Sequence, residues 1–489
     1  MATTYLSKSL FIRGRQCHKS LWLQKHRPEL KDEISDAQQA IFQSGTDVGI
    51  LAQELFPGGI EIPYDGLTHQ QQIDQTRIEI EKGTETIYEA TFLQDGIFVK
   101  ADILHHGARG WEIYEVKGST EAKDVHVFDA AIQYRVLTDA GIEVSKVAIV
   151  HVNNTYIRYG ELNIKQLFSI VDITGQTQEL QETITDELAG QREMLAGDMP
   201  AIDIGRHCDD PYPCDFKGHC WQHIPDDSVF DLRGRGVDKF ALYYQGIVLQ
   251  ENIPLGMLNS SQRLQVESTL NQRDQINTKA VQEFIDGLWY PRCFLDFETF
   301  MDAIPPFDGS RPYQQIPFQY SLHIQVSPNA DLQHYEYLAE PGKDPRRELL
   351  DTLLERIPEG ACIIAWNQSF EIGVLRKLAE FFPDSREQVE RWIENFRDLM
   401  QPFKSKDIYL WQAKGSYSIK PILPLLVPEL SYKNLDGVAD GGDAMEAWHL
   451  MNSLDDPAEV AKIRNALLEY CKLDTFAMVR ILERMREMI

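Results

Sequence analysis

The sequence predicts a mixed α/β protein in which two α/β units are joined by a helical connector. The chain has 489 residues, of which 43% are hydrophobic and 25% charged, so it can hold two or three domains with ordinary cores. Short β-type runs alternate with helical segments before residue 225 and again after residue 288. Between these points the apolar residues recur with a helical period only. We therefore divide the chain into residues 1–224, 225–288 and 289–489.

The first unit contains a predicted β-hairpin that carries charged residues. It follows two helical segments, at residues 17–25 and 34–56. Asp102 lies on the first strand of the hairpin, and Glu115 and Lys117 lie on the second. Because side chains alternate along a strand, Glu115 and Lys117 point to the same face. Two carboxylates can hold a divalent metal, and a lysine beside them can orient a water molecule or offset charge on a phosphate.

The connector and the third unit are distinguished by their periodicity. The connector has helical patterns at residues 238–244 and 260–286. The third unit begins with β-type runs at residues 292–297, 318–326 and 334–338. A helix then ends at Pro383, and a long last helix starts after Asp456, with Pro457 at its first position.

Five residues with acidic or phenolic side chains form a pattern across the third unit. Asp296 and Glu298 are two apart in an apolar run, so on a strand they share one face. Glu371 opens a helical stretch, and Asp474 follows Tyr470 by one helical turn. Gathering carboxylates in a core is costly unless cations neutralise them. The pattern therefore predicts a site for two divalent cations, Mg²⁺ or Mn²⁺, as used for in-line displacement at phosphorus.

The order DxE, NxxFE and YxxxD resembles the DEDD-type 3′–5′ exonucleases of the ribonuclease H-like superfamily, in the subgroup with a tyrosine in the last motif. The resemblance implies that Asp296 contacts both metals, that Glu298 and Asp474 hold the metal that activates the attacking water, and that Glu371 supports the other. It also implies that Tyr470 orients that water. The family usually has Asp at the position of Glu371. The metal-binding side chain at this position is therefore one methylene longer here.

Asn367 stands four residues before Glu371 and has two interpretations of equal weight. It contacts the nucleic acid, or it caps the helix that carries Glu371.

In the first unit, Asp102, the Glu115-Val116-Lys117 run and the later Gln133-Tyr134 resemble the PD-(D/E)XK nucleases, in particular their RecB-like branch. Glu89 precedes this set. The resemblance implies a second nuclease site, and we expect Gln133 and Tyr134 on a helix at residues 128–137 to face it and the nucleic acid. A hairpin with a charged, exposed face is the alternative. Members of this branch often carry a metal-binding His on an early helix. Residues 45–49 contain no His, so either the metal site is weakened or Asp47 takes part in it.

Seven cysteines in a chain of this length do not indicate a disulfide framework. Three of them lie singly in apolar runs and are interpreted as small core residues: Cys293, Cys362 and Cys471. The other four are placed once before and three times after the predicted nuclease core: Cys17, Cys208, Cys214 and Cys220.

This layout resembles the iron–sulfur RecB-like nucleases, which include AddB nuclease domains and CRISPR-associated exonucleases. The resemblance implies a structural [4Fe–4S] cluster that closes a long loop of chain. The gaps of five residues between the last three cysteines depart from the usual family spacing. Zinc is the alternative metal, because four thiolates, or three thiolates with a nearby His, also bind zinc. Unliganded thiols are the third interpretation.

The formal net charge of −27 argues against non-specific binding of nucleic acid. Residues 1–28 differ from the rest because they hold six basic residues and no acid; a phosphate-contacting arm and a solvated helix face explain this equally well. No apolar run reaches the length of a membrane span, and the first residues lack the features of a signal peptide. We expect a cytoplasmic protein without a membrane partner.

The whole pattern is similar to a bacterial fusion of an iron–sulfur RecB-like nuclease with a DEDD-type exonuclease. We expect 3′–5′ degradation of DNA, in particular of single strands. One alternative keeps only the C-terminal activity, with the first unit as a DNA-binding clamp. Others are an RNA exonuclease, a non-catalytic nucleic-acid adaptor and a redox sensor; an adaptor has no need of clustered acids. Protein partners and the pathway (repair, processing or defence) stay open.

Overall fold

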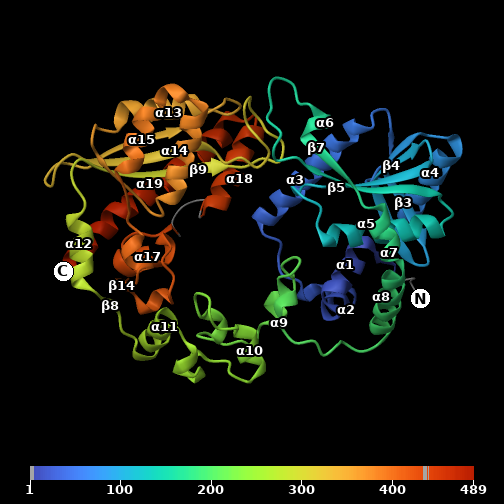
Figure 1. Ribbon diagram of the computed structural model, residues 1–489, viewed down its shortest axis with the longest axis horizontal. Coiled ribbons are helices and arrows are strands. Elements are labelled where there is room, and N and C mark those ends of the chain that lie inside the picture. Colours follow the sequence, from blue (N-terminus) through green and yellow to red (C-terminus); the bar gives the residue numbers. More distant parts are fainter. Residues whose placement is uncertain (1–4, 433–437, 439) are drawn as a thin grey trace. The chain divides into compact units, whose positions relative to one another are not determined.

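Two sheets flanked by helices give the protein a mixed α/β fold (Figure 1). The computed structural model describes residues 5–432, 438 and 440–489. The chain divides into two compact units, one of residues 1–223 with 302–313 and the other of residues 224–301 with 314–489. The first boundary lies beside the division placed at residue 224 from the sequence. The predicted connector, residues 225–288, is not a separate unit but part of the second one.

The first unit is built on a seven-stranded mixed sheet in the order β2-β3-β4-β5-β6-β7, with β1 paired to β4. Its strands are β1 (Leu6–Ser7), β2 (Ile60–Glu61), β3 (Thr86–Gln94), β4 (Ile97–Gly107), β5 (Gly110–Lys117), β6 (Val144–Val152) and β7 (Phe168–Asp172). The hairpin of β4 and β5 is the one that the sequence predicts. It pairs from Gly107 and Gly110 only as far as Ile103 and Tyr114, after which the two strands separate.

Both faces of this sheet are buried. One face packs against a core that includes residues of α1 (Lys8–Gln16), α5 (Asp124–Asp139) and α8 (Gln181–Ala196). The other face is covered by α3 (Asp36–Ala52) and by the segment 302–313, whose Ala303 is buried there. The remaining helices of the unit are α2 (His18–His26), α4 (His69–Lys82), α6 (Ile164–Leu167), α7 (Thr174–Glu179) and α9 (Lys217–Cys220).

The segment 302–313 was not anticipated from the sequence. Arg158 binds it through its guanidinium group, which donates to the carbonyl oxygens of Pro305 and Pro306 at 3.0 and 2.9 Å. The backbone N–H of Arg158 donates to the carbonyl of Ser310 at 3.0 Å.

The second unit has a five-stranded sheet in the order β11-β10-β9-β12-β13. Its strands are β9 (Arg292–Phe300), β10 (Ile316–Gln325), β11 (Gln333–Leu338), β12 (Cys362–Ala365) and β13 (Phe396–Asp398). The pairs β9–β10 and β10–β11 are antiparallel, whereas β12 pairs in parallel with β9 and with β13. The strand β9 is therefore central and buried on both faces.

Helices cover the two faces of this sheet (Figure 1). One core joins the sheet to α13 (Arg346–Arg356), α14 (Ser369–Phe381) and α15 (Arg386–Glu394). The long last helix, α19 (Pro457–Glu487), packs on the opposite face, where Thr475 bonds to Ser321 and His323 of β10. As predicted, Asp456 caps α19, because its carboxylate accepts the N–H of Ala458. The unit also contains α16 (Gln401–Lys404), α17 (Ile419–Leu426) and α18 (Gly441–Ser453).

The connector is more broken than its periodicity predicts. It contains α10 (Lys239–Tyr244), α11 (Ser260–Asn271) and α12 (Thr278–Asp286). The expected helix at residues 260–286 stops at Gln272, which has a left-handed φ of 47°. A short strand, β8 (Gln275–Ile276), follows and pairs with β14 (Ile408–Tyr409).

Candidate metal centres

Asp296 and Glu298 project from the central strand β9 to the face that α19 covers. Their partners on β10 are Ser321 and Gln319. The alternate residues of β9, Leu295 among them, lie in the core on the opposite face, as strand geometry requires. Glu298 is buried and Asp296 partly so. The sheet thus holds two carboxyl groups side by side beneath a helix.

Glu371 reaches the same place from the first turn of α14. It is 1% exposed, and burial together with the charge of the nearby Asp296 raises the pKa of its carboxyl group. Its Oε2 atom is buried and has no hydrogen-bond partner. Two neighbouring buried carboxyl groups repel each other when both are ionised, and a buried oxygen without a partner is costly. Both observations fit a group that binds a cation.

Asp474 projects from α19 beside these acids. Its Oδ1 atom accepts a hydrogen bond of 2.5 Å from the hydroxyl of Tyr432, and Tyr470 stands one helical turn before it on α19. Burial raises the pKa of Asp474 to about 6, although the two hydroxyls and the charge of Lys420 act in the other direction. The structure therefore brings together all five acidic and phenolic residues of the predicted centre. Tyr432 was missed because it lies outside the motifs.

The electrostatics of this centre favour a cation. Burial raises the pKa values of Asp296, Glu298 and Glu371 well above their usual range. Repulsion adds to this effect, because the charge of Asp474 acts on Asp296, and the charge of Asp296 acts on Glu298 and Glu371. Lys420 opposes the shifts of Glu298 and Asp474. In the described residues the ammonium group of Lys420 balances one of the four acids, so a divalent cation would suit this site once the acids are deprotonated.

Lys420 is a further residue that sequence reasoning missed. It lies in α17, and its Nζ atom is 5.9 Å from the ring centroids of both Tyr432 and Tyr470. A cation over two phenol rings is held by their quadrupoles. This placement puts a positive charge next to the carboxylates, where a phosphate group could meet it.

Cys471 was interpreted as a small core residue, and it is fully buried. Its Sγ atom nevertheless lies 3.8 Å from Oδ2 of Asp296. Within the described part of the chain, Asp296, Glu298 and Cys471 form the one set of three potential metal ligands whose atoms all lie within 4.8 Å. Burial and the charges of Asp296 and Glu298 raise the pKa of the Cys471 thiol well above its usual range. The thiol is therefore protonated and serves as a donor to Asp296.

Asn367 stands in the turn between β12 and α14 and has a left-handed φ of 73°. Its side-chain oxygen accepts from the hydroxyl of Ser369 at 3.0 Å, and its N–H donates to Oδ1 of Asp398 at 3.0 Å. The cap residue of α14 is Gln368, which makes no side-chain cap bond. The cap interpretation of Asn367 is therefore wrong, and its exposed side chain stays a candidate contact for nucleic acid. Asp398, whose charge acts on Glu371, was not predicted.

The hairpin of the first unit brings its predicted residues together. Where β5 has left β4, Oδ2 of Asp102 accepts the N–H of Val116 at 2.6 Å. The Nζ atom of Lys117 lies 2.7 Å from Oε1 of Glu115. Gln133 of α5 donates to Oε2 of Glu115 at 2.5 Å. Burial and the charge of Glu115 raise the pKa of Asp102 to about 8.

Two charged residues of this centre were missed. Asp129, on α5, accepts a hydrogen bond from Lys117. Lys8, at the start of α1, lies 2.7 Å from Oε1 of Glu115 and 3.7 Å from Oδ2 of Asp129. Burial works against the ionised form of Glu115, but the charges of Lys117 and Lys8 outweigh it and lower the pKa of Glu115 below its usual range. A helical Asp-x-x-x-Gln spacing could have indicated Asp129; nothing local indicates Lys8.

Four residues expected at this centre need correction or detail. Gln133 is completely buried, so it supports Glu115 and does not contact nucleic acid. Tyr134 packs against the hydrophobic core instead of facing the carboxylates. Asp47 is exposed on α3 and bonds to Gln43. Glu89, on β3, has a left-handed φ of 55°, and burial raises its pKa, with the charges of Lys100, Lys8 and Glu115 acting on it.

The four separate cysteines line one cavity of the first unit: Cys17, Cys208, Cys214 and Cys220. The side chains of Ile204 and Phe216 also line it. Burial raises the pKa values of the Cys17 and Cys220 thiols, and the other thiols add to both shifts. The backbone N–H of Gly205 donates to the sulfur of Cys208 at 3.5 Å. An amide donor and a shared cavity suit thiolates that bind a cationic group.

The thiols of this cavity are not in close contact with one another. A tetrahedral zinc site has Zn–S bonds of about 2.3 Å, which places its sulfur atoms about 3.8 Å apart. Among the described residues, no three of these sulfurs lie within 4.8 Å of one another. The arrangement is therefore wider than a closed zinc site.

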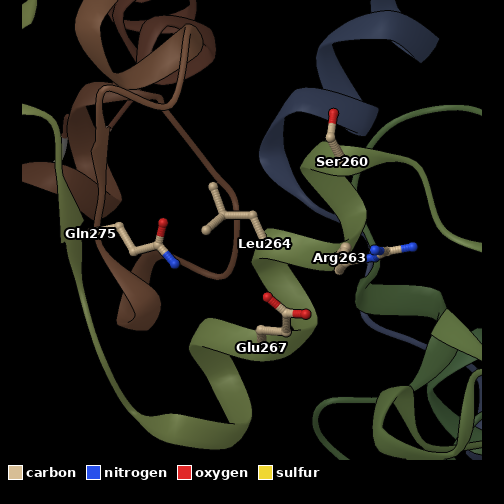
Figure 2. A pocket seen from close by; sticks show the side chains of 5 residues that line it. All are labelled: Ser260, Arg263, Leu264, Glu267 and Gln275. Atoms are coloured by element: carbon tan, nitrogen blue, oxygen red, sulfur yellow. The ribbon is translucent and has the colours of Figure 1, made fainter.

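A separate hollow of about 510 Å³ lies on the connector, along α11 (Figure 2). It is lined by Ser260, Arg263, Leu264, Glu267 and Gln275. Leu264 points toward Gln275 across it (Figure 2). None of these residues was predicted to be functional, and a single acid does not make a metal centre. In the described residues, no helix combines the length and the apolar composition that crossing a membrane requires.

Comparisons with known proteins identify relatives without an assigned function. Residues 293–418 match a family described as a domain of unknown function (DUF2779). The chain is 28% identical over 209 residues to an uncharacterized MG366 homolog of Mycoplasma pneumoniae, covering 39% of this chain and 31% of that protein. It is 23% identical over 217 residues to uncharacterized protein MG366 of Mycoplasma genitalium, covering 40% and 32%. The matched part thus spans about a third of the length of these relatives.

Proposed function

We propose that this chain is a metal-dependent nuclease that removes nucleotides from the 3′ end of single-stranded DNA at the centre in its second unit. The observation that carries the proposal is the set of four buried or half-buried acids, Asp296, Glu298, Glu371 and Asp474, with the ammonium group of Lys420 near them in the described part of the chain. Carboxylate oxygens are the ligands of Mg²⁺ and Mn²⁺. Two such cations supply the Lewis-acid chemistry of in-line displacement at phosphorus.

The roles of the side chains follow the DEDD-type arrangement that the motifs resemble. Asp296, between the other acids, would ligate both cations. Glu298 and Asp474 would hold one cation, and Glu371, with its unpartnered Oε2 atom, would hold the other. The Tyr470 hydroxyl, beside Asp474, orients the attacking water.

Lys420 adds a role that the motifs do not contain. Its ammonium group lies on the same side of the centre as the two phenol rings and acts electrostatically on Glu298 and Asp474. A positive charge there stabilises the charge that develops on the phosphate oxygens.

The fold supports this assignment. The second unit has a mixed sheet with its acids on the central strand and an acid-bearing helix at its end, as expected of a ribonuclease H-like domain. The first unit has the hairpin, with Asp102 and Glu115 on adjacent strands, and the following helix, as expected of a PD-(D/E)XK domain.

For the first unit we propose a second, slower nuclease centre at Asp102, Glu115 and Lys117. A specific observation favours the alternative of a DNA-binding clamp. The two oxygens of Glu115 already accept from two ammonium groups and one amide, so a cation must compete with them. Activity that survives in an Asp296→Ala variant and disappears when Lys117→Ala is added would identify a second nuclease.

We also propose that Cys17, Cys208, Cys214 and Cys220 hold a [4Fe–4S] cluster. Four thiols line one cavity of the first unit. The cluster would join residue 17 to residues 208–220 and so close a loop of about 190 residues, a large entropic constraint on the unfolded chain. Anaerobic protein with one zinc and no iron would instead favour the rival metal.

An adaptor or redox sensor without catalysis is less consistent with the second unit. An adaptor gains nothing from four acids whose ionisation is opposed by burial. RNA stays an alternative substrate, because the centre shows no group that distinguishes a 2′-hydroxyl.

The proposal is tested with anaerobically purified protein on 5′-labelled single-stranded DNA, duplex DNA and RNA, with Mg²⁺ or Mn²⁺. We expect a ladder of 3′-shortened single-stranded DNA that depends on the metal. Asp296→Asn should abolish it, whereas Asp455→Asn, an exposed acid near the start of α19, should not change it. A ladder of equal rate in the Asp296→Asn variant would reject the assignment of this centre.

A further inference from the structure

Lys8 is placed by a short strand that lies in the gap between β4 and β5. The strand β1 pairs in parallel with β4 through Leu6 and Ser7, opposite Ile97 and Phe98. At Ile97 and Phe98, one edge of β4 is paired with β3. The strand β1 therefore pairs with the other edge, which β5 occupies only from Ile103 onward. Ser7 then caps α1, because its hydroxyl accepts the N–H of Leu10 at 3.3 Å. Lys8, the first residue of α1, is thereby directed to the carboxylates of β5.

The ammonium group of Lys8 duplicates the contacts of Lys117. Both Nζ atoms lie 2.7 Å from the same atom, Oε1 of Glu115. Both also contact Oδ2 of Asp129. The side chains of the two lysines are about equally exposed, at 21% and 22%, whereas that of Glu115 is 1% exposed. Two cations thus share two acids at the edge of a buried site.

These contacts occupy the positions that a metal ion would use on Glu115. A carboxylate offers about four lone-pair directions, and Glu115 already accepts from Lys8, Lys117 and Gln133. Lys117 and Gln133 belong to β5 and to the helix that packs on it. Lys8 comes from a different element, 107 residues away in sequence. It is the donor that can leave without disturbing the hairpin.

We propose that Lys8 is a built-in cation that stands in for a divalent metal at the first unit's carboxylates and so determines how weakly that centre binds metal. The inference rests on the proposed second centre and adds to it the residue that controls its metal affinity. It also explains why acids as crowded as these are stable without a metal. Lys8 and Lys117 neutralise half of the formal charge of Asp102, Glu115, Asp129 and Glu89.

Removing Lys8 should therefore open the centre to metal. The formal charge of the group falls from −2 to −3, and one lone pair of Glu115 becomes free. Repulsion between an ammonium group and a divalent cation at contact distance also disappears. We expect the affinity of this centre for Mn²⁺ to rise at least tenfold.

The experiment measures Mn²⁺ binding to the anaerobically purified full-length chain by electron paramagnetic resonance, in an Asp296→Asn background. Lys8→Met removes the charge and keeps an unbranched side chain. Lys8→Gln is the second variant, because it also keeps a hydrogen-bond donor and so preserves the fold if Met does not. Adding Glu115→Gln to each identifies which Mn²⁺ is bound in the first unit. Lys82→Met is the matched control, since Lys82 is 61% exposed and pairs with Glu79, away from Glu115.

The expected result is a Mn²⁺ site that depends on Glu115 and is at least tenfold tighter in Lys8→Met and Lys8→Gln, with no change in Lys82→Met. An equally tight Glu115-dependent site while Lys8 is present would overturn the inference and leave the second centre standing. Binding that is insensitive to Glu115→Gln in every variant would overturn both the inference and the metal centre in the first unit.

Discussion

Replacing Asp474 by Asn should stabilise the metal-free second unit at neutral pH and abolish its nuclease activity. Asp474 is 8% exposed, and burial raises its pKa from 3.8 to about 6. Between these values the folded protein keeps a proton that the unfolded chain has released, so stability falls as pH rises through this window. A shift of about two pKa units corresponds to about 3 kcal/mol. Asn does not titrate, so the variant escapes this loss.

The assay is amide hydrogen exchange of α19 and β9 in EDTA at pH 4 and pH 8, which reports the stability of this unit separately. The advantage of Asp474→Asn over the wild type should grow by about 3 kcal/mol between the two pH values. Asp455→Asn, an exposed acid near the start of the same helix, should show no such change. Adding Mg²⁺ should stabilise the wild type and not the Asp474→Asn variant. A difference that is the same at both pH values would refute the reasoning.

Three further predictions concern the two units. Tyr470→Phe should retain Mn²⁺ binding but slow single-strand degradation about 10²-fold, because the water loses its orienting hydroxyl; an unchanged rate in a gel assay would remove Tyr470 from the mechanism. The Mg²⁺ affinity of the second unit should increase from pH 5 to pH 8, since the Asp474 carboxyl, with its pKa of about 6, must lose its proton before it can bind the metal. Calorimetry in two buffers of different protonation enthalpy would detect the released proton. Cys208→Ser should lose iron and the broad absorbance at roughly 400 nm, whereas Cys293→Ser, in the core of the other unit, should keep both.

The parts that sequence reasoning predicted are those that depend on local periodicity. The alternation of Asp296 and Glu298 with Leu295 placed both acids on one face of a strand. The spacing of Tyr470 and Asp474 placed both on one side of a helix, whose start at Pro457 the cap signal located. The hairpin with Asp102 and Glu115 followed from two β-type runs and a glycine-bounded turn.

The parts that were missed depend on long-range pairing. Tyr432 lies 42 residues from Asp474 and carries no motif. Lys8 is brought to Glu115 by a strand of only two residues, which has no periodicity to read. The excursion of residues 302–313 and the break at Gln272 have the same cause, because tertiary contacts override the local pattern there.

The helix α1 joins two sites that have been treated separately. It has nine residues and is on the order of 14 Å long. Lys8 stands at one end, and Cys17 follows directly at the other. Arg13 clamps the helix to Asp215, next to Cys214, through two hydrogen bonds of 2.5 and 2.9 Å. A short helix moves along its axis as one body. Whatever group the thiols bind would therefore also set the distance between the Lys8 ammonium group and Glu115. If the proposed cluster is present, measurements of metal binding at the acidic centre should be made on protein that retains it.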